Sequence, residues 1–533
     1  MFETTINSST ESNERQGSGD RVARADQAPY LTPYSAAEIV DPHMWNVTCA
    51  KWTSVIKDDQ LLRQLLNSYF LHQYSPFFAF QKDYFLQDMA RGGSRFCSPL
   101  LVNTILAAAC RAHSSIPDRA KFWDPDNLAY RFLAEAKRLW ELQVGRSSLT
   151  SIQAAILLNT ISNSDGMDKI GRMYMLQAVA MANDIGLFGS HAEIKGNKMR
   201  RARAFTAWGV MAWDAMESFY FHREPLLKRP PDGSPPDPAV DPAWYGEIWV
   251  RYPLNSFVSP THLGSNTKAL MDLRLLMHDM AHAYFGRSVS QERGPALAQV
   301  LGFRSRLDAW FSAFPAPLRY RQIMLPSHIK VHMEYYTTVI TLAQSQSQHA
   351  EDHAASYGGM SPSETISDAY IRLETLMRLY YLRHSFDAHD MFLIQFLVFL
   401  GNQVLEILDR NLAPQDVDAY RSTLILCVMG LHIQGASSYL MHVIYYLLRN
   451  RMKPHDRDLL LTYVKEDPGE DEELIAQHTQ ANWVLPIIKI NEDPKTAILD
   501  NLVKEYETLS MDGASTSSPN PSPSPSVALE GAC

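Results

Sequence analysis

Two histidines one helical turn apart are the residues of this sequence that come nearest to a metal site. His278 and His282 stand in the order His-Asp-Met-Ala-His, which places both imidazoles on one face of a helix. A zinc protease needs a glutamate directly after the first histidine as its general base, whereas Asp279 is shorter, and the spacing shows no third ligand. We therefore expect histidines of an amphipathic surface or interface, and the sequence predicts no metal-binding residue.

A second polar group could form near residue 387. His384 and His389 are flanked by Asp387 and Asp390, and the four side chains could gather in a local cluster. Such a group is more typical of a helix start than of a catalytic constellation. The sequence therefore predicts no catalytic residue here.

Signatures of common enzymes are missing from the sequence. It contains no G-x-S-x-G, no P-loop and no G-x-G-x-x-G fingerprint. Asp58-Asp59 is followed by Gln-Leu-Leu, so it is not an Asp-rich diphosphate-binding motif. We expect no catalytic residue, no cofactor-binding residue and no cofactor. The alternative, an all-α small-molecule-binding protein or enzyme of a biosynthetic pathway, stays open because the 22 methionines could line a ligand cavity as well as fill a core.

The five cysteines are scattered along the chain, at Cys49, Cys97, Cys110, Cys427 and Cys533. No C-x-x-C pair occurs, so the sequence predicts neither a disulfide framework nor a local zinc site, which fits a reducing compartment such as the cytosol or nucleus. A binuclear zinc cluster needs six thiolates in a short segment, and the first 48 residues contain none. The net charge of −9 argues against a basic nucleic-acid clamp. We expect no DNA-binding residue.

Helical periodicity dominates the middle of the sequence. Apolar residues recur at i, i+4 and i+8 from Leu61 to Phe70, which places a double apolar row on one helix face. A similar period can be read in 100–112, 152–162, 171–187, 203–221, 268–285, 329–345, 364–383, 391–411 and 418–448. Convincing alternating strands and Asn-Gly hairpins are absent. We therefore expect an all-α fold, with one large multi-helix domain over residues 51–507.

Both ends of the chain have the composition of disordered segments. Residues 1–50 are polar with almost no helical period, and residues 508–533 include a Ser/Pro run. We expect both tails to be disordered.

Three interruptions divide the helical pattern. The proline-rich stretch 225–260 cannot sustain a helix, and we expect an extended strap pinned to the helices by its rings. Residues 345–362 are polar and contain two adjacent glycines, which favours a mobile loop. The acidic run 466–473 is typical of a solvated loop between helices. The rings of the strap are Trp244, Tyr245, Trp249 and Tyr252.

Residues 421–449 require a test for a membrane span. Between Arg421 and Arg449 no Asp, Glu, Lys or Arg occurs, and about 20 apolar residues suffice to cross a bilayer. Polar residues interrupt the run, and Gly435 indicates a break between two packed helices. Hydrophobicity all round a helix also means burial in a large protein, so we expect two core helices and no membrane contact.

Several segments follow one another in an order that resembles a known family. They are an acidic pair, a Leu-rich helix and an aromatic-proline turn within 51–89; a helix start at Ser98-Pro99 before an Ala run; a helix pair at 149–158 and 171–187; and an Arg-aromatic helix with an aspartate from 201 to 225. Looser matches follow at 244–260, 384–408 and 483–502. In the fourth segment Arg201 and Arg203 could pair with Asp184 or Asp214.

These segments resemble the middle regulatory region of fungal-specific transcription factors, in particular the nitrate-assimilation-regulator subgroup. Family members commonly have a Gly-Arg-Pro-like turn where this chain has Arg223-Glu224-Pro225, which leaves the geometry of that turn open. They also usually carry an N-terminal Zn₂Cys₆ DNA-binding domain, which this sequence lacks. Either the protein works without its own cluster, as a co-regulator or competitor of zinc-cluster proteins, or the cluster lies upstream of an incomplete gene model.

The resemblance implies binding rather than catalysis. It implies a nuclear regulator of nitrogen or secondary-metabolite genes whose helical body responds to a small-molecule effector in an inter-helix pocket or to a protein partner. The partner would be a zinc-cluster transcription factor or the transcription machinery, DNA would be contacted only indirectly, and a homodimer is allowed. Such a switch requires the effector to prefer one conformation by a few kcal/mol.

Overall fold

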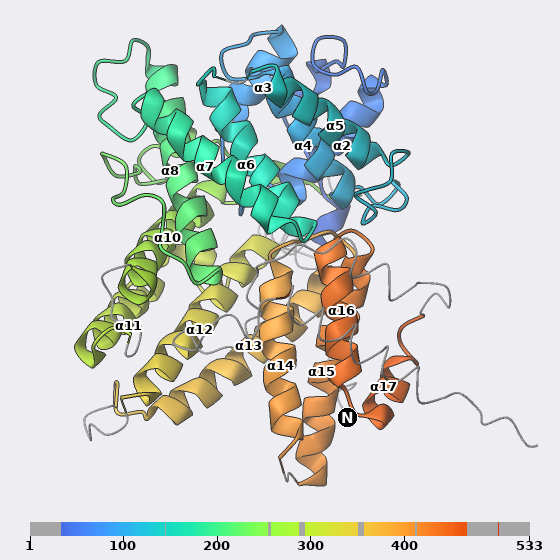
Figure 1. The fold of residues 1–533 in the computed structure, drawn as a ribbon, viewed down its shortest axis with the longest axis vertical. Helices are drawn as coiled ribbons and strands as arrows, with labels where there is room; N and C mark the ends of the chain where they lie inside the picture. Colours follow the sequence, from blue (N-terminus) through green and yellow to red (C-terminus); the bar gives the residue numbers. More distant parts are fainter. Residues whose placement is uncertain are drawn as a thin grey trace, which may run out of the picture.

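The computed structural model describes residues 33–143, 145–253, 257–286, 294–349, 356–410, 413–465 and Leu499. These residues form an almost entirely helical body (Figure 1). The predicted all-α fold is confirmed.

The helices and strands are listed here in chain order. The α-helices are α2 (Asp59–His72), α3 (Lys82–Arg91), α4 (Pro99–Ala112), α5 (Leu128–Glu141), α6 (Leu149–Ser164), α7 (Asp168–Asp184), α8 (Asn197–Tyr220), α9 (Pro242–Tyr245), α10 (Leu263–Phe285), α11 (Leu297–Ser312), α12 (Pro326–Ser347), α13 (Pro362–His384), α14 (Leu393–Leu408), α15 (Pro414–Gly435), α16 (Tyr439–Arg451) and α17 (Pro454–Leu460). The short elements are η1 (Tyr34–Ala36), β1 (Glu38–Ile39), η2 (Met44–Asn46), β2 (Trp249–Arg251), β3 (Val258–Pro260) and η3 (Ala316–Leu318).

The helices gather in two groups along the long axis of the molecule. Helices α2 to α7 lie at one end, and α11 to α16 lie at the other (Figure 1). Helix α8 lies beside α6 and α7 in the first group and packs against α10, which leads towards α11 and α12 (Figure 1). Helix α6 also contacts α16, so the two groups touch directly as well as through α10.

Helix α6 lies at the centre of the N-terminal group. Every residue from Leu149 to Ser164 is buried, and the helix packs against α4, α7 and α8. A helix enclosed on all sides has to satisfy its polar side chains internally. The Asn159 amide does so by donating from Nδ2 to Glu217 Oε1 at 2.9 Å.

Helix starts follow local chemistry where the sequence predicted them. The Ser98 hydroxyl accepts a hydrogen bond from the Leu101 N–H at 3.2 Å, and Pro99 takes the first helical position, so this predicted start is confirmed.

Residues 421–449 divide between α15 and α16, with Gly435 at the end of α15. The two predicted helices are therefore present, and no helix among the described residues has the length and hydropathy of a bilayer span.

The prediction of a disordered segment over residues 1–50 is wrong for residues 33–50. Tyr34, Ile39 and Val47 are buried, and the Ile39 N–H donates to Asn67 Oδ1 at 2.8 Å. The apolar residues of this segment have no helical period because each packs separately against the helices, so tertiary contacts order it rather than a local pattern. Residues 1–32 lie outside the described part.

Residues 33–50 and the strap meet in a small antiparallel sheet, which the sequence did not indicate. Its order is β1-β2-β3, with Glu38 opposite Arg251 and Val250 opposite Ser259. Each strand is two or three residues long, which is too short for an alternating pattern to be recognised in the sequence.

The strap 225–260 contains the short helix α9 and the strands β2 and β3. Trp244, Tyr245 and Tyr252 are buried against the helices, as expected, whereas Trp249 is 46% exposed. Side chains alternate between the faces of a strand, and Val250 occupies the inward position, so its neighbour Trp249 points outward.

The remaining boundaries differ from the prediction in detail. Helix α12 extends to Ser347, and Ser345 is fully buried, so the first residues of the predicted loop 345–362 are helical. Residues 350–355, the acidic run 466–473 and the tail 508–533 lie outside the described residues. Of residues 466–507 only Leu499 is described, and it is buried in the core.

Candidate functional site

A small pocket lies where the two helical groups meet. Its volume is about 70 Å³, and its wall comes from α6, α7, α8, α14, α16 and the residues just before α14. The lining is mainly apolar and sulfur-containing, with a few polar groups. It comprises Asn163, Asp168, Trp213, Met216, Glu217, Tyr220, Phe221, Met391, Phe392, Ile394, Gln395 and Leu440. A largely apolar pocket with a few convergent polar groups between helices is typical of a small-molecule site.

The carboxylate of Glu217 forms the charged floor of this pocket. It is 2% exposed, and it lies 3.2 Å from Arg172 Nη1 and 2.9 Å from Arg223 Nη2. The Asn159 amide also donates to it, at 2.9 Å. Two guanidinium groups and an amide therefore compensate one buried charge, which leaves little attraction for a further cation or anion.

One turn before Glu217, Asp214 connects α8 to the beginning of the strap. Its carboxylate accepts hydrogen bonds from the backbone N–H groups of Leu226 at 3.2 Å and Leu227 at 2.9 Å. Burial raises the pKa of Asp214, against these hydrogen bonds and the nearby Arg172. The Asp214 carboxylate thus anchors the residues that follow the turn at Arg223-Glu224-Pro225. The Arg223 N–H donates to Ser218 O at 3.0 Å and so satisfies a carbonyl in the last turn of α8.

Three polar atoms of the pocket wall have unused hydrogen-bonding capacity. Among the described residues, Asn163 Oδ1, Tyr220 Oη and Gln395 Nε2 are buried without a hydrogen bond of normal geometry. Burial raises the pKa of the Tyr220 hydroxyl, so this group stays protonated and can donate. Tyr220 and Gln395 also lie close enough to interact with each other. A cavity of about 70 Å³ with a mainly apolar lining suits water or a small neutral molecule.

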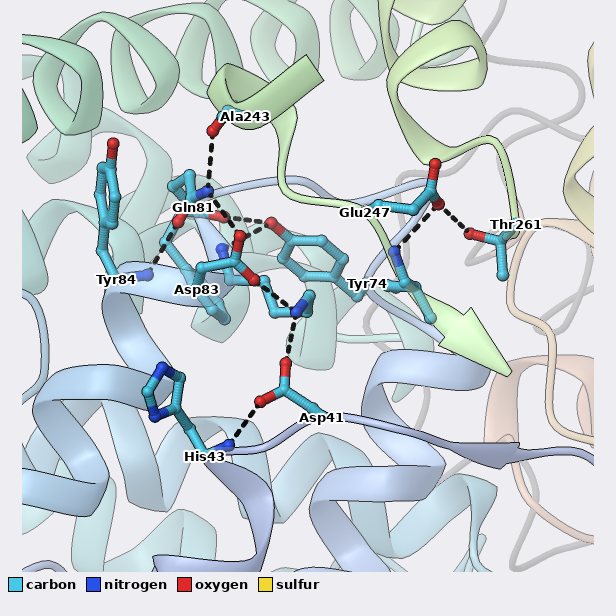
Figure 2. A network of polar contacts seen from close by, with 12 residues as sticks. Asp41, His43, Tyr74, Gln81, Asp83, Tyr84, Ala243, Glu247 and Thr261 are labelled. Carbon is cyan, nitrogen blue, oxygen red and sulfur yellow. Dashed lines mark hydrogen bonds and ion pairs between the residues drawn. The ribbon is translucent and has the colours of Figure 1, made fainter. Parts of the chain in front are cut away.

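A second polar network fixes the strap and the N-terminal segment to the helices (Figure 2). The Lys82 ammonium is buried and lies 2.7 Å from Asp41 Oδ2 and 2.5 Å from Asp83 Oδ1. These carboxylates raise the pKa of Lys82 in spite of its burial. On the strap, Glu247 Oε1 accepts hydrogen bonds from the Thr261 hydroxyl at 3.0 Å and the Leu263 N–H at 3.1 Å, which satisfies the start of α10. This network is a structural clamp, because each of these charged groups has an ion-pair or hydrogen-bond partner within the protein.

The two histidines of α10 lie beside the strap. His278 is 3% exposed and His282 is partly exposed, so the expected surface or interface position is wrong for His278. It fails because α10 packs against α8 and the strap, so this face of the helix is covered. Both Nε2 atoms lie near the backbone oxygen of Leu227, at 2.7 Å and 3.2 Å.

The predicted cluster around residue 387 does not form as a unit. His384 ends α13 and binds Met324 O through Nε2 at 2.8 Å, whereas His389 binds the Ser437 hydroxyl through Nδ1 at 2.9 Å. Asp390 pairs with Lys330 at 2.5 Å and Asp387 accepts from Ser385. The side chains diverge because they lie in the bend between α13 and α14 and point to different neighbours.

Arg201 and Arg203 do not form the ion pairs with Asp184 or Asp214 that the sequence allowed. Arg201 binds Asp241 of the strap at 2.8 Å, and Arg203 donates to the backbone oxygens of Ile185 and Gly186. Asp214 lies on the buried side of α8 and has Arg172 as its nearest cation, at 3.8 Å.

The sequence interpretation missed the residues that form the pocket. Glu217 and Asp214 stand three positions apart within a largely apolar helical run, and a pair of carboxylates there signals a buried polar network. Tyr220 and Gln395 carry no comparable signal, because they come together only through the packing of α8 against α14. No group of three or more His, Cys, Asp or Glu side chains suited to a metal gathers in the described part of the chain.

Comparison with protein families supports the resemblance seen in the sequence. Residues 66–312 match the family described as fungal specific transcription factor domain. The matched range contains the second half of α2 and all of α3 to α11, including Glu217 of the pocket.

The relatives found are fungal regulators. The chain is 28% identical over 353 residues to the nitrogen assimilation transcription factor nirA of Emericella nidulans, covering 63% of this chain and 39% of that protein. It is 28% identical over 352 residues to the nitrogen assimilation transcription factor nit-4 of Neurospora crassa, covering 62% and 31%. For the notoamide biosynthesis transcriptional activator notL′ of Aspergillus versicolor the identity is 25% over 306 residues, covering 56% and 47%. The chain thus spans less than half the length of each relative, and no solved structure matches it.

Proposed function

We propose that this protein is a transcriptional regulator of nitrogen or secondary-metabolite genes, because its residues 66–312 match the fungal specific transcription factor domain. The carrying observation is this family match, together with relatives that regulate nitrogen assimilation or notoamide biosynthesis. Family and relatives are transcription factors and not enzymes. The proposed activity is therefore binding coupled to a change in conformation.

The pocket at the interface of the two helical groups is the proposed effector site. A molecule that fills it contacts α8 on one side and α14 on the other, so its binding energy depends on how the groups are placed. Only an effector that binds one arrangement better can shift the population between arrangements. The lining is mainly apolar and its Glu217 carboxylate is compensated by two guanidinium groups, which favours a small neutral effector.

The output of the domain is proposed to pass to a zinc-cluster DNA-binding module. In this proposal the helical body does not read bases itself, and the module belongs either to a partner protein or to a further part of the same polypeptide. Action of this kind requires the nucleus, which a fluorescently tagged chain tests directly in fungal cells.

A tethering assay tests the function. The full chain is fused to a heterologous DNA-binding domain, and transcription of a reporter is measured in fungal cells grown on different nitrogen sources. We expect the reporter to respond to the growth condition. The variant Ile394→Phe, which narrows the pocket, is expected to make the output independent of condition, whereas Ile371→Phe on the 64% exposed surface of α13 keeps the response.

Two results count against the proposal. One is a reporter that stays at background under every condition although the fusion accumulates in the nucleus. The other is a purified chain with catalytic turnover on a small molecule, which favours the biosynthetic-enzyme alternative.

A further inference from the structure

The side chains of His278 and His282 converge in a way that the sequence spacing alone does not require. Their Nε2 atoms lie 3.2 Å apart, and the rings meet edge to face with centroids 4.5 Å apart. Two ligand nitrogens of a tetrahedral zinc ion, each about 2.1 Å from the metal, are separated by roughly 3.3 Å. The pair is therefore already spaced as a chelate.

A backbone oxygen completes a triangle of donor atoms. Leu227 O lies 2.7 Å from His278 Nε2 and 3.2 Å from His282 Nε2. Asp214 holds this residue in place by accepting the Leu227 N–H at 2.9 Å. An ion about 2.1 Å from all three atoms lies roughly 1 Å out of their plane and leaves a fourth position for water. Tetrahedral ligands are about 3.4 Å apart, so the contact between Leu227 O and His278 Nε2 has to widen when the ion binds.

Carboxylates stand on the opposite edges of both rings. His278 Nδ1 lies 3.7 Å from Asp279 Oδ1, and His282 Nδ1 lies 4.0 Å from Glu224 Oε1. Both distances are longer than a hydrogen bond, so each carboxylate has to move closer to its ring before it can accept the Nδ1 proton. Metal-ligating histidines usually have a carboxylate or carbonyl on the second nitrogen, which fixes the tautomer and raises the basicity of the ligand nitrogen. The contact between His278 Nε2 and Leu227 O is a hydrogen bond that the ring donates, because a carbonyl oxygen can only accept. Metal binding therefore requires this proton to move to Nδ1, the edge of the ring that faces the carboxylate.

The site is closed on one side and open on the other. His278 is buried, whereas the side chains of His282 and Glu224 are 28% and 38% exposed. An ion can therefore enter from solvent past His282 and reach donors that the fold has already positioned. Two imidazoles and one carbonyl form a neutral set suited to zinc and its neighbours rather than to calcium or magnesium.

We propose that His278, His282 and the backbone oxygen of Leu227 form a binding site for Zn²⁺, supported by Asp279 and Glu224. A bound ion links α10 to the beginning of the strap, which α8 holds through Asp214. It stabilises this junction by an amount set by its affinity and concentration. The site lies outside the effector pocket, and the proposal holds or fails independently of the regulatory function.

The chain contains a matched pair that serves as a control. His328 and His332 on α12 have the same i, i+4 spacing, but their Nε2 atoms bind different backbone oxygens, those of Thr261 at 3.2 Å and Leu318 at 2.6 Å. Both are buried. Spacing is shared between the two pairs, and only the α10 pair is directed at one common point.

Zinc titration of the purified full chain, stripped with a chelator, tests the proposal by calorimetry. We expect one saturable Zn²⁺ site whose affinity falls at least tenfold in His282→Gln and about tenfold in Glu224→Gln, the latter being the usual effect of removing a supporting carboxylate. His332→Gln is expected to keep the wild-type affinity. Cobalt substitution provides a second measurement, because tetrahedral Co²⁺ gives strong visible absorption that His282→Gln should abolish.

The melting temperature of each variant in chelator separates loss of the site from loss of the fold. His282 is partly exposed, so the His282→Gln variant should have a melting temperature close to that of the wild type in chelator. Zinc should raise the melting temperature of the wild type but not that of this variant. Absence of saturable zinc binding, or binding of equal affinity in wild type and His282→Gln, overturns the proposal.

Discussion

Replacing Arg274 by methionine is expected to destabilise the protein more than any surface change of similar size. Arg274 on α10 and Glu334 on α12 form a two-pronged ion pair, with Nη2 to Oε1 at 3.0 Å and a second contact from Nη1 to Oε2. Their side chains are only 4% and 2% exposed. In Arg274→Met the Glu334 carboxylate stays buried without its cation.

The expected loss can be worked out from this burial. Breaking a buried pair by removing one partner costs about 3–5 kcal/mol, because the remaining charge is uncompensated. Unfolding entropy is about 2.1 cal/mol/K per residue, so roughly 400 residues that unfold together give about 0.8 kcal/mol/K. The melting temperature should therefore fall by about 4–6 °C.

Thermal and urea unfolding of four proteins measures this effect. The double variant Arg274→Met with Glu334→Leu replaces the pair by apolar side chains and should recover most of the loss, since such replacements are often neutral or stabilising. Arg372→Met, which removes the exposed pair with Asp368, should change the stability by less than about 1 kcal/mol. A wild-type midpoint for Arg274→Met, or a double variant no more stable than the single one, refutes the reasoning.

Two further predictions follow from burial and close packing. Burial lowers the pKa of His384 to about 4, whereas an ordinary histidine has a pKa near 6.5. Between pH 6.5 and pH 4 the imidazole of the unfolded chain therefore takes up a proton and that of the folded chain does not. The free energy of unfolding falls as the pH falls through this window. In His384→Gln the fall in the free energy of unfolding should be smaller, by up to about 1.4 kcal/mol per pH unit. Urea unfolding at a series of pH values measures it. A pH profile equal to that of the wild type contradicts the lowered pKa of His384. A Cβ at Gly209 of α8 would lie 2.6 Å from Phe78 O, so Gly209→Ala should lower the free energy of unfolding by about 1–3 kcal/mol. A Cβ at Gly302 of α11 would have nothing within 4 Å, so Gly302→Ala should raise that free energy by up to about 1 kcal/mol. Equal melting temperatures for the two variants would show that α8 can move away from Phe78.

Local chemistry in the sequence predicted much of the helical framework. Ser98 and Pro99 specify a helix start through one hydroxyl and one fixed backbone angle, and Gly435 ends a helix where its neighbour approaches closely. Such signals act within a few residues, so they can be recognised without knowing what packs against them. The order of these segments also identified the family that the comparison found over residues 66–312.

The same local reasoning failed where distant segments decide the outcome. Tyr34 and Ile39 lie in a stretch with the composition of a disordered tail, yet they are buried against residues far along the chain. The pocket residues Tyr220 and Gln395 are 175 positions apart and acquire a shared role only when α8 meets α14. Composition cannot report such a meeting, because it depends on how helices cross.

The sequence by itself determined that this chain folds into helices, where many of them begin and end, and which family it resembles. It could not distinguish His278 and His282 from His328 and His332, since both pairs have the same spacing. The tertiary structure distinguishes them, because it brings one backbone oxygen, that of Leu227, to the first pair and separate oxygens to the second. Periodicity determines which face of a helix a side chain occupies, and only packing determines what that face meets.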